Sequence, residues 1–482
     1  MRTTERLRLA ATGGRSDVLR IACTALGAAL SALVLLMTAT VLAIKDDGTS
    51  FYRIRLLNEA GLRVGVVVAL LLLAVPVLVF TGVTSRLGSP GRDRRLAAVR
   101  LAGATPADVR AVVALETGLA AAAGSVVGGL GFLALRAVVD QTTTRHVVDR
   151  RPGGTLAVAI HAWPTDVTPN VPMAAVALLF VPVAATLFAL LALRRVELTP
   201  FGVAVGEKAR VPAVLPAAAL VVGSLGVGLF SSVAWRLGIR SEAMATSVLW
   251  VFVALAIAGL LWGSASMAML VGRVLSARAR GVAGLVAGRR LVAHPWEASK
   301  VTASIILAVV AGGAAAVLRS VTLLQVASQN AVNGSTDGDQ LSFFRQSYDV
   351  VYVVVVVGLV LSCLGLLVVQ AEAVVSRRRA LAGLVAAGTP RAVLVRATLI
   401  EVLAPLIPMV LVATVVSAGV AAWSYGGLSR GSENGALTFA PVPWADLGLL
   451  VVVAVGAVLL TTLLSLVTLR SATRPRELRL AS

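Results

Sequence analysis

The chain has 482 residues, of which 58% are hydrophobic and 14% are charged, and its mean hydropathy is +0.91. Soluble proteins carry roughly 25% charged residues, so the composition excludes a soluble globular protein and indicates a polytopic membrane protein. The net charge of +20 does not indicate nucleic-acid binding, because aromatic residues make up only 5% and the arginines lie in alternate connections between apolar runs.

Ten apolar runs are long enough to cross a bilayer as helices, which takes roughly 17–25 residues. We therefore expect an all-α polytopic membrane fold with ten transmembrane helices. The expected spans are residues 18–44, 64–83, 112–135, 171–193, 211–233, 245–271, 301–317, 350–374, 397–423 and 447–469.

The connections between these runs alternate between arginine-rich and nearly neutral segments. Cytoplasmic connections of membrane proteins carry the excess of basic residues, so both termini are expected in the cytoplasm. Only three of the 43 basic residues are lysines, a bias that indicates a GC-rich bacterial genome. The sequence therefore predicts a multi-pass protein of a bacterial cytoplasmic membrane.

Spans one to four and seven to ten resemble two copies of one unit, with spans five and six inserted between them. A basic amphipathic stretch precedes each copy, at residues 6–10 and 289–293, and each is expected to lie along the inner membrane surface. Both copies cross the membrane in the same direction, so they are parallel pseudo-repeats rather than an inverted pair. The expected segments are residues 1–200 for the first repeat, 201–280 for the two-span insert and 281–482 for the second repeat.

One cytoplasmic pattern occurs twice: a basic helix, a glycine turn, and a membrane helix with an acid near its start. The first copy runs from Arg92 to Glu116 and the second from Arg377 to Glu401, and in each copy 13 positions separate the turn glycine from the acid. Membrane orientation requires positive charge but not a repeated turn, so the pair predicts two docking sites for a cytoplasmic protein that is itself a dimer. The candidate docking residues are Arg92, Arg94, Arg95, Leu96, Val99, Arg100, Gly103, Thr105, Pro106, Arg377, Arg378, Arg379, Gly388, Thr389 and Pro390.

The residue types at the first turn predict its geometry. Gly103 can end the basic helix in a left-handed conformation, Thr105 is a favoured N-cap, and Pro106 is favoured as the first helical residue. Asp108 then places an acid near the positive end of the helix dipole. The second copy keeps the glycine, with Thr389 as the expected cap and Pro390 after it, but has Ala392 in place of the acid.

Glu116 and Glu401 are the only acids near the cytoplasmic ends of spans three and nine. A charge at the centre of a membrane helix costs roughly 2.5–3.5 kcal/mol on insertion scales, and less near the interface. Each acid is therefore expected to face the helix bundle and to accept hydrogen bonds from a neighbouring basic residue. A proton or ion relay is the alternative function of these acids. Taken singly, Arg86, Arg110 and Arg396 are interpreted as orientation charges that contact lipid headgroups.

The pattern resembles the FtsX-like permease family of ABC transporters. The resemblance rests on Leu-Ala-Gly-Ala-Thr-Pro at residues 101–106 with Glu116, on the second copy around Gly388 with Glu401, and on Leu-Thr-Pro-Phe-Gly at residues 198–202. The ten-span arrangement is similar to the bacitracin-resistance branch of that family. The resemblance implies that residues 92–103 and 377–388 are coupling helices held in grooves of a partner ATPase, with two ATPase copies for the two helices.

One departure from that branch concerns the outside of the membrane. Bacitracin-type permeases carry a large extracellular domain between spans seven and eight, whereas only residues 319–349 are available here. This departure argues against antibiotic sensing by the chain. The sequence also has no Gly-x-x-x-x-Gly-Lys-Ser/Thr phosphate loop and no HExxH motif. We therefore expect no catalytic residue, metal site or cofactor in this chain, which would be a permease subunit rather than an enzyme, and ATP and Mg²⁺ on the partner ATPase.

Three functional hypotheses follow. In the first, ATP hydrolysis by a separate ABC ATPase drives the export or membrane extraction of an amphipathic peptide, antibiotic or lipid, an efflux activity compatible with antimicrobial resistance. In the second, the chain is a non-transporting mechanotransmitter that signals to a cell-wall hydrolase or a sensor kinase. In the third, it is an ion-coupled carrier that needs no ATPase. The expected partners are the ATPase and membrane lipids, not nucleic acid.

Overall fold

The computed structural model describes residues 15–45, 51–52, 54–58, parts of 63–81, 101, 103–139, 142–148, 155–161, 163–194, 214–236, 242–333, 338–376, 383, 388–425 and 441–472. The chain forms two compact units, Met1–Val205 and Gly206–Ser482. The two spans of the predicted insert group with the second unit. The division into three segments at residues 200 and 280 stays a prediction.

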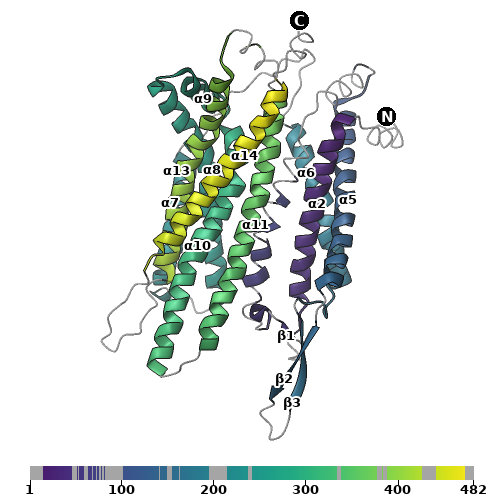
Figure 1. Ribbon diagram of the computed structural model, residues 1–482, viewed down its shortest axis with the longest axis vertical. Helices are drawn as coiled ribbons and strands as arrows, with labels where there is room; N and C mark the ends of the chain where they lie inside the picture. Colours follow the sequence, from purple (N-terminus) through teal and green to yellow (C-terminus); the bar gives the residue numbers. More distant parts are fainter. Residues whose placement is uncertain are drawn as a thin grey trace. The chain divides into compact units, whose positions relative to one another are not determined.

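Among the described residues of the first unit, three helices have bounds at both ends: α2 (Arg15–Leu42), α5 (Pro106–Val139) and α6 (Val171–Arg194). Each packs against the other two, and they lie side by side in Figure 1. The contact between α2 and α5 depends on glycine, because a Cβ atom on Gly124 or Gly128 would lie 2.2 or 2.3 Å from a carbonyl oxygen of α2. Small residues at such positions let two membrane helices approach closely.

A small sheet, which the all-α expectation missed, lies beyond the ends of α5 and α6 (Figure 1). Its strands β1 (Phe51–Tyr52), β2 (Thr142–Val148) and β3 (Thr155–His161) are ordered β1-β3-β2, and the short 3₁₀ helix η1 (Arg55–Leu57) follows β1. β2 and β3 pair antiparallel, whereas β1 pairs parallel to β3. The β-branched residues of β2 and the Pro-Gly-Gly sequence at 152–154 favour a hairpin, a local signal that the sequence analysis did not use.

Polar contacts attach the segment after β3 to the end of α5. The Arg136 guanidinium donates to the carbonyl oxygens of Val167, at 2.7 Å, and Thr165, and it lies 5.7 Å from the centroid of the Phe132 ring. The Tyr52 hydroxyl contacts the Asp166 carboxylate at 3.0 Å. These contacts satisfy backbone carbonyls where no helix or strand does so.

The second unit contains seven of the described helices: α7 (Val214–Arg236), α8 (Glu242–Arg278), α9 (Val282–Ala293), α10 (Pro295–Asn333), α11 (Gly338–Ser376), α13 (Arg391–Tyr425) and α14 (Trp444–Ala472). Helices α10, α13 and α14 pack against one another, as α2, α5 and α6 do in the first unit. Their shared core includes Ile305, Ile306, Leu406 and Val458, all fully buried.

Among the described residues, eight helices are long and apolar enough to cross a membrane, and α7 contributes a shorter apolar stretch, Val214–Phe230. The expected span at residues 64–83 is described only in part. The chain is therefore a mainly helical, polytopic membrane protein. The count of ten spans and the arrangement in two repeats stay predictions.

Helices α10 and α11 are longer than the expected spans at 301–317 and 350–374. Each has 39 residues, or about 58 Å at 1.5 Å per residue, whereas the hydrocarbon core of a bilayer is about 30 Å thick. Side-chain pairs join their polar ends, because Arg319 lies 3.6 Å from Asp349 and the Thr322 and Tyr348 hydroxyls are 2.8 Å apart. The polar residues that ended the apolar runs thus extend a helical hairpin instead of starting a loop.

The glycine contacts between α2 and α5 predict the effect of adding one methyl group. Gly124→Ala and Gly128→Ala should each destabilise the protein by about 1–3 kcal/mol, the usual cost of overpacking, because the backbone of α2 cannot move aside as a side chain can. Thermal unfolding in detergent measures this effect. Gly131→Ala is the control on the same helix, because its nearest neighbour would be Leu33 Cδ1 at 3.9 Å. Equal stability of all three variants would contradict this packing.

Candidate functional site

The predicted docking residues fall into two groups. Two glycine turns are described, Gly103 to Pro106 and Gly388 to Pro390. The basic parts of both copies lie outside the described residues; these are Arg92, Arg94, Arg95, Leu96, Val99, Arg100, Arg377, Arg378 and Arg379.

Both turn glycines adopt the left-handed conformation that their residue type predicts. The φ angle is +93° at Gly103 and +87° at Gly388, and among the described residues no non-glycine residue has a positive φ. A side chain at either position would be strained even though no neighbouring atom lies within 4 Å of the added Cβ. The backbone conformation, rather than lack of space, therefore requires glycine at the two turns.

The first turn leads into a reciprocal cap of α5. The Thr105 hydroxyl accepts a hydrogen bond from the Asp108 N–H at 3.2 Å, while the Asp108 carboxylate accepts from the Thr105 N–H at 3.2 Å and from its hydroxyl at 2.8 Å. This is the geometry of a capping box, with aspartate in the position usually held by glutamate. The predicted roles of Thr105, Pro106 and Asp108 at the start of the helix are confirmed.

The second turn reaches the same helix register in another way. Helix α13 begins at Arg391, so Pro390 rather than the expected cap Thr389 immediately precedes it, and the Val393 N–H donates to the Pro390 carbonyl at 3.0 Å. The reason is that one residue fewer separates the glycine from the threonine than in the first copy. In both copies the first helical residue is the third after the glycine.

This common register places the two acids alike. Glu116 is the eleventh residue of α5, and Glu401 is the eleventh residue of α13. The Glu116 side chain is buried, with 3% of its surface exposed. Glu401 accepts a hydrogen bond from Arg290 Nη1 at 3.3 Å, and about a quarter of each of these two side chains is exposed, 21% and 25%. The structure thus supplies a basic partner for the second acid, as the sequence predicts.

Arg290 belongs to α9, the amphipathic stretch before the second repeat. The prediction that this stretch is a helix is confirmed, but one face of it packs on protein. Gly288 and Leu291 are buried, and a Cβ atom on Gly288 would lie 2.7 Å from the backbone nitrogen of Ser276 in α8. Gly272 of α8 faces the same contact, with Leu291 Cβ at 2.8 Å. The corresponding stretch before the first repeat, residues 6–10, lies outside the described residues.

Helix α9 therefore joins two helices that are far apart in sequence, α8 through glycine contacts and α13 through the ion pair. The sequence analysis missed Gly272 and Gly288 as parts of this site. The spacing of Gly284 and Gly288, four residues apart in an amphipathic helix, was a signal for close helix packing. A movement of the turn at Gly388 would reach α8 through Glu401 and α9.

The ion pair predicts a measurable coupling between α9 and α13. A double-mutant cycle with Arg290→Ala and Glu401→Ala should give a coupling energy of about 0.6–1.7 kcal/mol, the average and upper values for polar pairs in a membrane protein. Denaturant unfolding of the purified protein in detergent measures the four stabilities. The control cycle replaces Arg290→Ala by Arg289→Ala, since Arg289 is the exposed neighbour on the same helix. The same coupling in both cycles would exclude a specific contact.

A comparison with family models gives one match, described as the C-terminal domain of FtsX-like permeases. It covers residues 66–198 and 352–473, together more than half of the chain. Each matched segment contains one glycine turn and one of the two acids. No curated protein matches the sequence.

Proposed function

We propose that this chain, which belongs to the FtsX-like permease family, works as the membrane-spanning subunit through which ATP hydrolysis by two copies of a separate ATPase drives movement in the membrane. Membership of the family makes it a permease component of an ABC transporter rather than an enzyme, and such permeases typically pair with an ABC ATPase. The observation that carries the proposal is the pair of left-handed glycine turns that set Glu116 and Glu401 at the same helix position.

In this proposal, residues 92–103 and 377–388 are the coupling helices. Each would insert into a groove of one ATPase copy, and ATP and Mg²⁺ would bind to the ATPase. The arginine-rich connections support an orientation with both termini in the bacterial cytoplasm. Nucleotide-driven closure of the ATPase dimer would move both turns, and the left-handed backbone at each glycine would pass this movement to α5 and α13.

The ion pair supports a path for this movement within the second unit. Since Glu401 is bound to Arg290, and α9 packs on α8 through backbone contacts, the insert α7–α8 would move with the second coupling helix. The substrate in this proposal is an amphipathic peptide, an antibiotic or a lipid that enters from the membrane and is exported or extracted. Such efflux would give resistance to an antimicrobial compound.

A second function, mechanical signalling without transport, is favoured by the hairpin of α10 and α11. The two helices are about twice as long as the bilayer core is thick, and Arg319 links their polar ends by pairing with Asp349 and by lying 5.3 Å from the centroid of the Tyr352 ring. A braced helical hairpin outside the cytoplasm could contact a cell-wall hydrolase or a sensor kinase. The helical ends at residues 319–349, which the sequence analysis treated as a short connection, would supply the contact surface.

The two glycine turns predict a loss of coupling when both are replaced. The double variant Gly103→Val/Gly388→Val should reduce stimulation of the partner ATPase at least tenfold without preventing membrane insertion, because valine disfavours a positive φ. The measurement is nucleotide hydrolysis by the reconstituted complex, with membrane fractionation to confirm insertion. Gly281→Val is the control, since Gly281 precedes α9 with an extended backbone, φ −147°, and open space around it. Unchanged stimulation in the double variant would refute the assignment of the coupling helices.

Transport and signalling predict different effects of Arg319→Ala. If the chain transports its substrate through the membrane, the variant should keep both ATPase stimulation and ATP-dependent movement of a labelled amphipathic peptide in vesicles. If the hairpin is a signalling arm, ATPase stimulation should persist while activation of the hydrolase or kinase falls. Peptide movement in the wild type that is unaffected by the variant would exclude the signalling function.

A further inference from the structure

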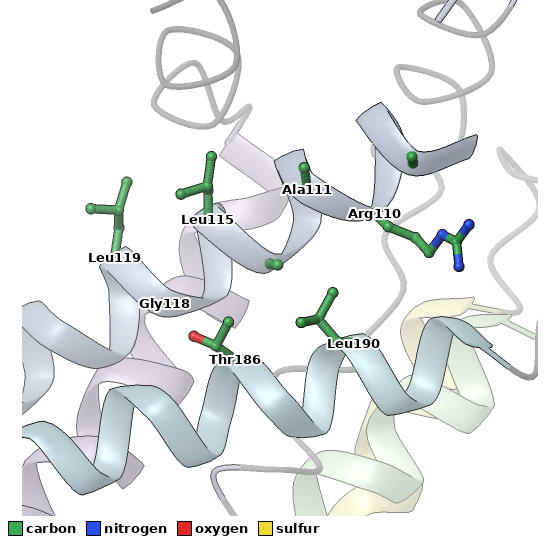
Figure 2. A pocket seen from close by; sticks show the side chains of 9 residues that line it. Arg110, Ala111, Leu115, Gly118, Leu119, Thr186 and Leu190 are labelled. Carbon is green, nitrogen blue, oxygen red and sulfur yellow. The ribbon is translucent and has the colours of Figure 1, made fainter. Parts of the chain in front are cut away.

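An apolar groove lies between α5 and α6 in the first unit. Its volume is about 650 Å³, within the roughly 300–1,000 Å³ typical of sites for small ligands. Leu115 and Leu119 line it from α5, and Thr186 and Leu190 line it from α6. Figure 2 shows Thr186 and Leu190 directed from α6 towards α5, with Arg110 at one end of the row of lining residues.

The groove includes a glycine at a position where the second copy of the turn pattern has a large apolar residue. With the two turn glycines and the two acids aligned, Gly118 of α5 corresponds to Leu403 of α13. Gly118 lines the groove, whereas Leu403 packs against the core of its own unit. A glycine that leaves a groove open where the other repeat places a large apolar side chain suggests a role specific to the first repeat.

The polar groups of the groove are concentrated at one end. The Thr186 hydroxyl donates to the Pro182 carbonyl of its own helix at 2.7 Å, so its polarity is satisfied within α6. Arg110 is an exposed residue in the second turn of α5, at the end that follows the arginine-rich segment. Arginine near the end of a membrane helix reaches the headgroup layer, so the groove runs from that layer into the hydrocarbon region.

We propose that this groove binds one anionic phospholipid of the cytoplasmic leaflet. Its acyl chain lies along Leu115, Gly118 and Leu190, and its phosphate pairs with the Arg110 guanidinium. Charge complementarity identifies the ligand, because a lipid is the molecule that joins an apolar chain to an anion at this depth of a membrane. The proposal goes beyond the proposed function, because it needs neither the ATPase nor a transported substrate.

The site lies close to the first turn. Arg110 is two residues beyond Asp108, whose carboxylate forms the cap with Thr105. A bound phosphate would place a negative charge near the positive end of the α5 dipole and would stabilise the start of that helix. Lipid composition would thus influence the first coupling segment.

Native mass spectrometry of the full-length permease, with equal amounts of phosphatidylglycerol and phosphatidylcholine added in mild detergent, tests the proposal. Wild-type protein should retain phosphatidylglycerol preferentially. Arg110→Gln should lower that preference about fivefold, the effect of roughly 1 kcal/mol for one basic residue near an anionic lipid. Arg396→Gln is the matched control, because Arg396 is an exposed arginine near the start of α13 in the second repeat, and it should leave the preference unchanged.

A second pair of variants tests the groove itself. Gly118→Leu combined with Thr186→Ala fills the groove and removes the hydroxyl that would lie 2.7 Å from the new Cβ, so retention of the lipid should fall. Thr186→Ala alone leaves the groove open and should retain the lipid. Thermal unfolding in detergent confirms that each variant is folded. An unchanged preference in Arg110→Gln, an equal loss in Arg396→Gln, or full retention in the filled variant would overturn the proposal.

Discussion

The cost of placing a carboxylate inside a membrane helix constrains much of this structure. An acid eleven residues into α5 or α13 is tolerated only where other groups satisfy it. In the second unit Arg290 satisfies Glu401, which fixes α9 against α13. Because α9 also packs on α8 through glycine contacts, the ion pair determines how α8, α9 and α13 fit together near the basic connections.

The two copies of the glycine-turn pattern preserve backbone geometry more closely than side-chain chemistry. Both turns place a glycine with positive φ three residues before a helix. The first helix is capped by Thr105 and Asp108, whereas the second begins after Pro390 and has Ala392, not an acid, three residues after its threonine. Gly118 and Leu403 also occupy equivalent backbone positions with different side chains. The two copies therefore share a backbone geometry but not the side chains around it.

Sequence reasoning predicted the parts of this protein that depend on local chemistry. The left-handed glycines, the Thr105 cap and the basic partner of an acid follow from residue types at fixed spacing, and they are found. The β2-β3 hairpin had a local signal that was overlooked, whereas the parallel pair joins Tyr52 to His161 across more than one hundred residues and leaves no local signal. The lengths of α10 and α11 were missed because hydropathy marks only where an apolar run ends. Both helices continue beyond that point, where polar pairs such as Arg319–Asp349 join them. The role of Gly288 could not be predicted without knowing that α8 packs on α9.

The contact between Gly272 and Gly288 also determines where the polypeptide could be divided into two genes. The backbones of α8 and α9 touch without room for a side chain between them. Separating the two helices would expose the buried face of α9. A two-gene version of this subunit would therefore keep α7 and α8 on the same product as α9 to α14. Its break would fall at the boundary between Val205 and Gly206, so that the halves would be unequal in size although each carries one glycine turn.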